Sequence, residues 1–252
     1  MQIKQRTFGT GRPLVCVPVV EHKEENIYQA AESAVRQGAE ALEWRMDWFA
    51  DVCRWEQTSR VLGNLQEICG DVILLCTFRS KPQGGEQEIS EDVYLELLER
   101  TAQSRCADLL DVEACQLADA PSVIHKLHDL GQWVIGSNHY FSHTPETEQM
   151  RQDIVEMRWA GADIGKLAVM PRSPLDVVRL LEITAQMKEE YPDYPLVTMA
   201  MGGLGAVSRI SGQAFGSCMT FASLGKTSAP GQMPLEDVAW MLDKLSESMD
   251  KK

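Results

Sequence analysis

The 252-residue sequence lacks the features of several protein classes. No run of consecutive Lys and Arg exceeds two residues and the formal net charge is −13, so a phosphate-binding surface for nucleic acid is not expected. No apolar run is long enough to span a bilayer, and residues 1–6 lack the apolar segment of a secretory signal. We therefore expect a cytoplasmic protein that binds neither nucleic acid nor membrane.

Paired cysteines are missing as well. The seven cysteines are scattered, and no Cys-x-x-Cys pair suggests a zinc or thiol-redox site. Several lie in apolar runs, where a free cysteine behaves as a small hydrophobe. We expect reduced core cysteines and no metal site. They are Cys16, Cys53, Cys69, Cys76, Cys106, Cys115 and Cys218.

The sequence does contain short apolar runs that alternate with longer segments of helical periodicity. This alternation is typical of the α/β class, in which parallel strands are joined by crossover helices. Eight such units and the chain length predict a closed (β/α)8 TIM barrel, with an open doubly wound sheet as the weaker alternative. The expected strands are 14–19, 41–44, 72–78, 107–112, 133–137, 164–169, 196–199 and 218–221.

Helix start signals follow several of these strands. Ser90, Thr144 with Pro145, and Ser173 with Pro174 are typical of helix N-termini. Residues 234–250 carry apolar side chains at helical spacing and are expected to close the ring. No linker or repeat interrupts the pattern, so we predict a single domain over 1–252, with 1–13 as an N-terminal extension that caps the barrel floor.

Polar residues cluster where the expected strands end. In a (β/α)8 barrel this end carries the chemistry, whereas the outer helices do not. A glycine-rich segment, 202–205, follows the seventh strand; it could cradle a phosphate, or tight backbone geometry could explain it. The other residues at this end are Glu43, Arg45, Asp47, Arg79, Asp111, Glu113, Asn138, His139, Ser208, Arg209 and 228–232.

Lys166 is the most informative of the polar residues because it lies inside an apolar strand. An ammonium group there must be paired or deprotonated. A neutral amine attacks a ketone to form an imine, which gives a buried lysine a chemical function. The alternative is a lysine paired with a buried Asp or Glu, and the sequence alone leaves both open.

His139 lies at a strand end, where an imidazole can transfer protons near neutral pH. The alternative is a loop histidine that bonds only the backbone. His143 follows four residues later, but Pro145 argues against a helix, so no metal pair is expected.

Three arginines, Arg45, Arg79 and Arg209, could converge on a substrate carboxylate, which a guanidinium binds through two parallel hydrogen bonds. The alternative is structural pairing with neighbouring carboxylates such as Asp47 and Glu113. We expect at least one of the three to be paired in this way.

These segments together resemble the type I 3-dehydroquinate dehydratases, or 3-dehydroquinases, which have a class I aldolase-like barrel. The motifs occur in family order over nearly the whole chain. They are Glu-Trp-Arg-Met-Asp at 43–47, Thr-Phe-Arg-Ser at 77–80 with Gly-Gly-Glu at 84–86, Ser-Asn-His at 137–139, 163–171, Ser-Arg at 208–209 with 215–217, and Ser-Ala-Pro-Gly-Gln at 228–232.

The resemblance implies a hydro-lyase of the shikimate pathway for aromatic amino acid biosynthesis. It would convert 3-dehydroquinate to 3-dehydroshikimate and water by syn elimination, as a homodimer, without a metal or organic cofactor. Carried onto this sequence, Lys166 forms a Schiff base with the ring ketone, and His139 serves as general base and then as general acid.

The resemblance also implies substrate contacts. Arg209 would hold the carboxylate, and Gln83 and Glu86 would orient the histidine. Many members carry Glu where Gln83 stands, and a neutral amide stabilises an imidazolium less, so the pKa of His139 is expected to be lower here. Pro18, Trp48 and Gly203 also depart from residues common in the family. The remaining contacts would come from Glu43, Arg45, Arg79, Ser228 and Gln232, with Met201 packing against the ring.

Two other functions remain as alternatives. Another Schiff-base aldolase-type barrel enzyme would keep the lysine but would not need the arginines and the 228–232 segment together. A non-catalytic protein that binds a shikimate-like acid would not need both Lys166 and His139, and the presence of both speaks against it.

Overall fold

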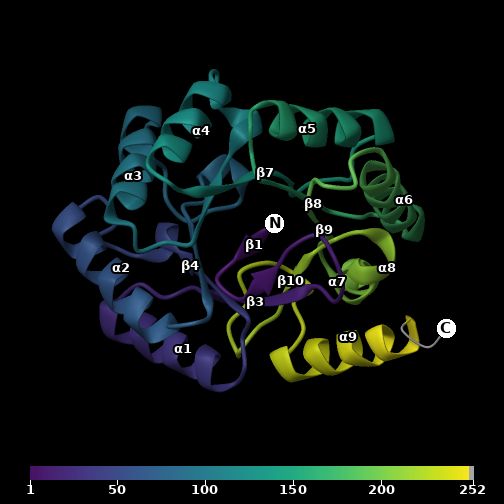
Figure 1. The fold of residues 1–252 in the computed structure, drawn as a ribbon, viewed down its shortest axis with the longest axis horizontal. Coiled ribbons are helices and arrows are strands. Elements are labelled where there is room, and N and C mark those ends of the chain that lie inside the picture. Colours follow the sequence, from purple (N-terminus) through teal and green to yellow (C-terminus); the bar gives the residue numbers. More distant parts are fainter. Residues whose placement is uncertain (250–252) are drawn as a thin grey trace.

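Eight parallel strands form the centre of the structure, and helices surround them (Figure 1). The computed structural model describes residues 1–249. The strands are β3 (Leu14–Val19), β4 (Ala41–Arg45), β5 (Ile73–Thr77), β6 (Leu109–Val112), β7 (Trp133–Tyr140), β8 (Ile164–Val169), β9 (Leu196–Ala200) and β10 (Met219–Phe221). All eight predicted strands are present, with ends that differ by a few residues.

The sheet closes on itself. Each strand from β3 to β8 pairs in parallel with the next along the chain, and β10 pairs with β3. Between β9 and β10 a parallel bridge joins Leu196 to Ser217, and the Cys218 amide donates to the Leu196 carbonyl at 2.7 Å. The predicted (β/α)8 barrel is therefore confirmed, and the open doubly wound alternative is wrong.

Helices follow the strands around the barrel. They are α1 (Glu24–Arg36), α2 (Trp55–Cys69), α3 (Glu91–Ser104), α4 (Ala120–Asp129), α5 (Thr147–Trp159), α6 (Pro174–Glu190), α7 (Ala206–Ile210), α8 (Gly212–Phe215) and α9 (Leu235–Met249). Ser90 and Ser173 are N-caps as predicted, whereas α5 begins after Glu146 rather than at Pro145. The last helix was expected over 234–250, and Asp250 lies outside the described residues.

The core has two layers, one inside the barrel and one between the sheet and the helices. Alternate residues of a strand face opposite sides, so strands that are buried on both faces are apolar throughout. Leu75, Ile135 and Ile164 pack inside the barrel, while Leu42 and Val134 pack under the helices. Burying each of these side chains stabilises the fold by about 2 kcal/mol.

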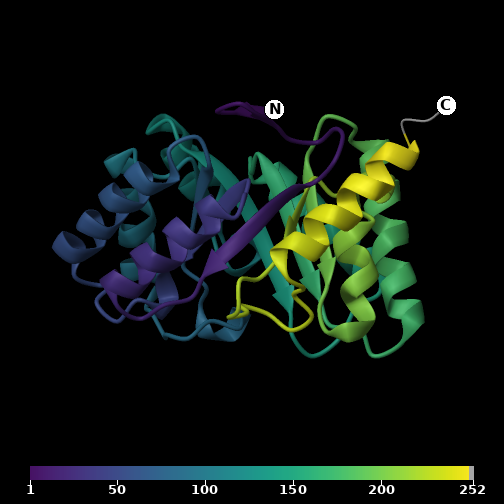
Figure 2. The same ribbon diagram turned by 90° about the horizontal axis from the view of Figure 1, so that it is seen from below.

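The N-terminal residues cover the end of the barrel where the strands begin (Figure 2). Strands β1 (Gln2–Ile3) and β2 (Arg6–Thr7) form a small antiparallel hairpin, and the buried side chains of Ile3 and Phe8 join the apolar cluster inside the barrel. Lys4 fixes this hairpin through an ion pair of 2.7 Å with Asp108. The strands end at the opposite end of the barrel from this hairpin, and the polar residues predicted for the site lie there.

None of the seven cysteines is in a disulfide. Cys16, Cys69, Cys76 and Cys218 are buried as predicted, and burial raises the pKa of the Cys69 thiol to about 12. Cys53 is exposed, so the expectation of a core position is wrong for that residue. Among the described helices, none has both the length and the apolar character that crossing a membrane requires.

Candidate active site

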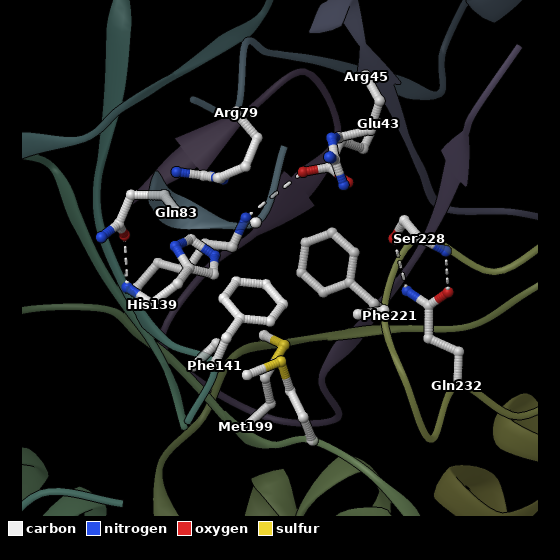
Figure 3. A pocket seen from close by; sticks show the side chains of 15 residues that line it. Glu43, Arg45, Arg79, Gln83, His139, Phe141, Met199, Phe221, Ser228 and Gln232 are labelled. Atoms are coloured by element: carbon white, nitrogen blue, oxygen red, sulfur yellow. Dashed lines mark hydrogen bonds and ion pairs between the residues drawn. The ribbon is translucent and has the colours of Figure 1, made fainter. Parts of the chain in front are cut away.

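A cavity opens where the strands end, and it brings together most of the residues predicted for the site (Figure 3). Of the eleven predicted residues, only Arg209 and Glu86 are absent from its wall. Its lining residues are Glu43, Arg45, Arg79, Gln83, Gly84, His139, Phe141, Lys166, Ala168, Met199, Met201, Phe221, Ser228, Ala229 and Gln232. They come from six of the eight strands or from the loops that follow them.

Lys166 lies on β8 with its side chain pointing into the barrel, 4% exposed. Its Nζ is 3.0 Å from Oδ2 of Asp111 and 3.4 Å from Oε1 of Glu43. The same nitrogen lies 4.7 Å from the centre of the Phe221 ring. The amine is paired with carboxylates and also lines a cavity. The structure is therefore compatible with both interpretations of Lys166, the ion-paired lysine and the imine-forming lysine.

Arg79 is fully paired. It donates to Asp111 at 2.7 Å, to Glu113 at 3.0 Å and to the Ser137 hydroxyl at 3.0 Å. Burial disfavours its charge, but Asp111 and Glu113 outweigh burial and raise the pKa of Arg79 above its usual value. This arginine stays charged, and its main contacts are structural.

Arg45 forms a two-bonded ion pair with the fully buried Asp47, with both contacts at 2.8 Å. The same carboxylate accepts the backbone N–H groups of Arg79 at 3.2 Å and Glu86 at 3.1 Å. Asp47 therefore ties the end of β4 to the loop that follows β5. The prediction that at least one arginine is structurally paired is confirmed for both Arg45 and Arg79.

Arg209 differs from the other two arginines. It lies on α7, 1% exposed, and among the described residues no carboxylate lies within ion-pair distance of it. Its guanidinium donates to the carbonyls of Pro230 at 3.2 Å and Phe221 at 3.5 Å, and its Nε is buried without a partner. Burial lowers its pKa to about 10. A buried cation without a counter-ion is costly, and a bound anion would offset that cost.

His139 lies within β7, which continues to Tyr140 and is three residues longer than predicted. Its backbone N–H donates to Oε1 of Gln83 at 2.7 Å and to Oδ1 of Asn138 at 3.0 Å. The imidazole stacks on Phe141, with ring centres 6.2 Å apart and planes 18° apart. Its Nδ1 is buried without a partner.

The imidazole of His139 is held in its neutral form. Burial, followed by the charges of Arg79 and Lys166, lowers the pKa of His139 well below its usual value, and Asp111 opposes this shift only in part. A neutral imidazole can accept a proton, which is the state that a general base requires.

The two residues expected to orient the histidine do not bond its ring. Gln83 is buried and lines the cavity, but it bonds the backbone of His139 (Figure 3). The Glu86 side chain is exposed, and only its backbone N–H is bonded, to Asp47. The structure therefore shows no contact through which Glu86 would orient the imidazole, and Gln83 bonds the strand that carries it.

Ser228 and Gln232 bond each other across the loop before α9. The Ser228 N–H donates to Oε1 of Gln232 at 2.8 Å, and Nε2 of Gln232 donates to the Ser228 hydroxyl at 2.9 Å (Figure 3). Gly231 has a φ of 81°, and a Cβ there would lie 2.3 Å from the Gly202 carbonyl oxygen. Within 202–205, Gly202 has a φ of 70° and a Cβ at Gly205 would lie 2.1 Å from the Ala200 carbonyl oxygen, which favours the tight-geometry explanation for these two glycines.

The sequence interpretation missed the apolar wall of the cavity. Phe141, Met199 and Phe221 line it together with Ala168. Ala168 could have been found from the period of two along a strand, because it follows Lys166 on the same face. The aromatic wall shields the amine from bulk water.

A second polar cluster lies outside the cavity, on the α5 side of β7. Asp153 accepts from Asn138 at 3.0 Å, from the Tyr140 hydroxyl at 2.7 Å and from Gln149 at 2.9 Å. Cys115 and Glu156 lie nearby, and with Asp153 they form a group of possible metal ligands within the described chain. Because both oxygens of Asp153 already accept hydrogen bonds, the cluster anchors β7 and we assign no metal to it.

Comparisons with known proteins agree with this geometry. The family model described as type I 3-dehydroquinase matches residues 15–249. The 3-dehydroquinate dehydratase of Klebsiella pneumoniae (strain 342) is 41% identical over 248 residues, which cover 97% of this chain and 98% of the relative. That of Clostridioides difficile (strain 630) is 37% identical over 251 residues, with 99% and 98% covered.

Solved structures give the same result. The 3-dehydroquinate dehydratase of Geobacillus kaustophilus HTA426 superposes with a TM-score of 0.95 at 35% identity, covering 100% of this chain and 97% of that one. The type I enzyme of Clostridium difficile, with covalently modified comenic acid, also gives 0.95, at 37% identity and 98% coverage of both chains. Both matches extend over essentially the whole barrel.

Proposed function

The chain belongs to the type I 3-dehydroquinase family of hydro-lyases, and we propose that Lys166 and His139 carry out the reaction at the cavity described above. The reaction is the conversion of 3-dehydroquinate to 3-dehydroshikimate through a Schiff base, in the shikimate pathway. This reaction is the one that the sequence motifs predicted, and it replaces the aldolase-type and non-catalytic alternatives.

One observation supports the proposed roles most strongly. The amine of Lys166 and the imidazole of His139 line the same cavity, whose wall is largely apolar. The reaction needs a nucleophilic amine and a proton-transfer group within reach of one ring. The direct test is the absorbance of the conjugated enoate product when purified protein meets 3-dehydroquinate. No change in absorbance would contradict the activity.

The first chemical step makes an imine. Lys166 first gives up one proton; its amine then adds to the ring ketone, so the C–N bond forms as the carbonyl π bond breaks, and the carbonyl oxygen leaves as water with that proton and a second one from the same nitrogen. The product is a protonated imine, a better electron sink than the ketone. The neighbouring C–H therefore becomes more acidic than in the free substrate.

His139 then moves the proton. Its neutral imidazole removes the proton next to the imine carbon, and the electron pair flows to nitrogen to give a neutral enamine. The enamine expels the β-hydroxyl, which leaves as water with the proton from the imidazolium. Hydrolysis of the product imine releases 3-dehydroshikimate and restores Lys166, so one histidine serves as base and then as acid.

The substrate contacts follow from charge and position. We assign the carboxylate to Arg209, since the other two arginines already have carboxylate partners. Arg209 does not line the cavity, but it bonds the backbone of Phe221 and Pro230 at the cavity edge, so a small shift of the 228–232 loop would expose it. The ring would contact Glu43, Arg45, Arg79, Ser228 and Gln232 and pack against Met201.

Replacing Arg209 with Lys is expected to raise the KM for 3-dehydroquinate by roughly 10- to 100-fold with a smaller change in kcat, because an ammonium cannot make the two parallel hydrogen bonds of a guanidinium. Steady-state kinetics by product absorbance measure the effect. Arg36→Lys, on the exposed end of α1, is the matched control. An unchanged KM in Arg209→Lys would remove this residue from the carboxylate site.

We further propose that the protein acts in the cytoplasm as a single-domain chain that forms a homodimer. Seven unpaired cysteines fit a reducing compartment. An apolar surface extends over neighbouring parts of α6, α7, α9 and the turn at Gly203–Gly205, and such surfaces mark protein contacts. Its residues and their exposures are Leu175 (73%), Val178 (57%), Leu204 (51%), Val207 (47%) and Trp240 (62%).

Trp240→Glu is expected to convert the dimer to a monomer in sedimentation velocity, because it puts a charge into the proposed apolar contact. Trp159→Glu is the control, since Trp159 is 79% exposed on α5, outside this surface. A wild-type protein that sediments as a monomer, or a Trp240→Glu variant that stays dimeric, would contradict the proposed surface.

A further inference from the structure

Asp111, at the end of β6, is a carboxylate to which the sequence motifs gave no role. It is fully buried, and both of its oxygens accept hydrogen bonds. Oδ2 is 3.0 Å from Nζ of Lys166. Oδ1 accepts from Arg79 at 2.7 Å and from the Ser137 hydroxyl at 2.6 Å. Three donors, from β7, β8 and the loop after β5, therefore fix this carboxylate against the reacting nitrogen.

Glu43, on β4, also approaches this nitrogen. Its Oε1 is 3.4 Å from Nζ of Lys166 and accepts from the Thr77 hydroxyl at 2.9 Å. Glu43 lines the cavity, whereas Asp111 does not. A substrate in the cavity can therefore take over the contacts of Glu43, while the contact between Asp111 and the nitrogen stays out of its reach.

The charge of Asp111 is permanent at working pH. Burial by itself would favour the neutral acid, but Arg79 and Lys166 outweigh burial and hold the pKa of Asp111 well below its usual range. Such a carboxylate is a poor proton acceptor. What it offers the nitrogen is a fixed negative charge and a hydrogen-bond acceptor.

We propose that Asp111 is the counter-ion of the Lys166 nitrogen throughout the covalent cycle, a role that rests on the proposed function of Lys166. When the amine condenses with the ketone, a C–N bond forms, the carbonyl oxygen leaves as water with two protons from the lysine nitrogen, and that nitrogen becomes an iminium cation that keeps one N–H. That N–H donates to Oδ2. Removal of the ring proton neutralises the nitrogen, and loss of the β-hydroxyl restores the cation. Asp111 thus stabilises the imines of both substrate and product, because its negative charge is already in position before either cation forms.

Asp111→Asn tests this role because it keeps the shape and removes the charge. We expect kcat to fall by about 100-fold with KM within about threefold, as for loss of one preorganised electrostatic contact. The fraction of enzyme trapped by borohydride as a Lys166 adduct at steady state should fall as well. Asp108→Asn is the matched control, since Asp108 precedes the same strand at the barrel floor and pairs with Lys4.

Three results would overturn the role of Asp111: an unchanged kcat in Asp111→Asn, a change in KM alone, or a lower kcat with wild-type trapping. Failure of the proposed function is distinguishable, because the wild-type protein would then give no Lys166 adduct. If circular dichroism shows that Asp111→Asn does not fold, Asp111→Glu replaces it. This variant keeps the charge and should keep the trapped adduct, and loss of the adduct there would also overturn the proposal.

Discussion

Borohydride added during turnover is expected to leave a mass adduct on the peptide that contains Lys166. Hydride reduces the C=N bond of an imine to a stable secondary amine, so only the lysine that is bonded to the ring acquires the mass of the reduced ligand. Lys166 is buried among Glu43, Asp111 and Phe221 and lines the cavity, whereas Lys126 pairs with Glu99 on the outer surface. An adduct should therefore be confined to one peptide.

Substitution of Lys166 should remove turnover. Lys166→Met is expected to lower kcat by roughly 10⁵-fold or more, since the covalent route disappears. Lys166→Arg keeps a cation beside Glu43 and Asp111 but cannot form the imine, so it separates loss of charge from loss of chemistry. Lys126→Met is the matched control and should keep wild-type activity. An adduct on another peptide, or turnover by Lys166→Arg, would rule out Lys166 as the nucleophile.

His139→Ala is expected to lower kcat by about 10²- to 10⁴-fold, the range for loss of a general acid-base group. The imine should still form, because the amine and its partners Asp111 and Glu43 are untouched. Borohydride trapping should therefore still label Lys166 in this variant. His143→Ala is the control, since His143 is exposed beyond the strand end and outside the cavity wall. Wild-type turnover by His139→Ala would exclude this residue as the base.

The same histidine sets the expected pH dependence. Its pKa lies well below the usual value of 6.5, because burial and the charges of Arg79 and Lys166 disfavour the imidazolium. The base is lost only when the pH falls through this lowered pKa, so the acid limb of kcat/KM assigned to His139 should lie below pH 6.5. Gln83→Glu would add a negative charge nearby and should move that limb to higher pH. An acid limb above pH 6.5 in the wild-type protein would contradict the neutral state of His139.

Much of the fold could be predicted from the sequence because the signals are local. A strand that is buried on both faces needs an unbroken apolar run, and eight such runs separated by helical segments leave few arrangements other than a closed barrel. Strand ends could not be predicted in the same way: β7 continues through His139 to Tyr140 because Gln83 and Asp153, distant in sequence, bond this segment. Hydrogen bonds between residues that are distant in the sequence produce no local sequence pattern, so these strand ends could not be predicted.

The sequence by itself determined which residues can do chemistry here. Lys166 within an apolar strand, and His139 near the end of another, are visible without any structure, because burying a charge or an imidazole there has a cost that function must offset.

Only the tertiary structure decided which of the charged residues pair with one another. It paired Arg45 with Asp47 and Arg79 with Asp111, and it left Arg209 without a carboxylate partner among the described residues. It also brought Asp111 to within 3.0 Å of Lys166 across 55 residues of chain. The physical reason is that the energy of an ion pair depends on separation in space and on burial, and barrel closure sets both.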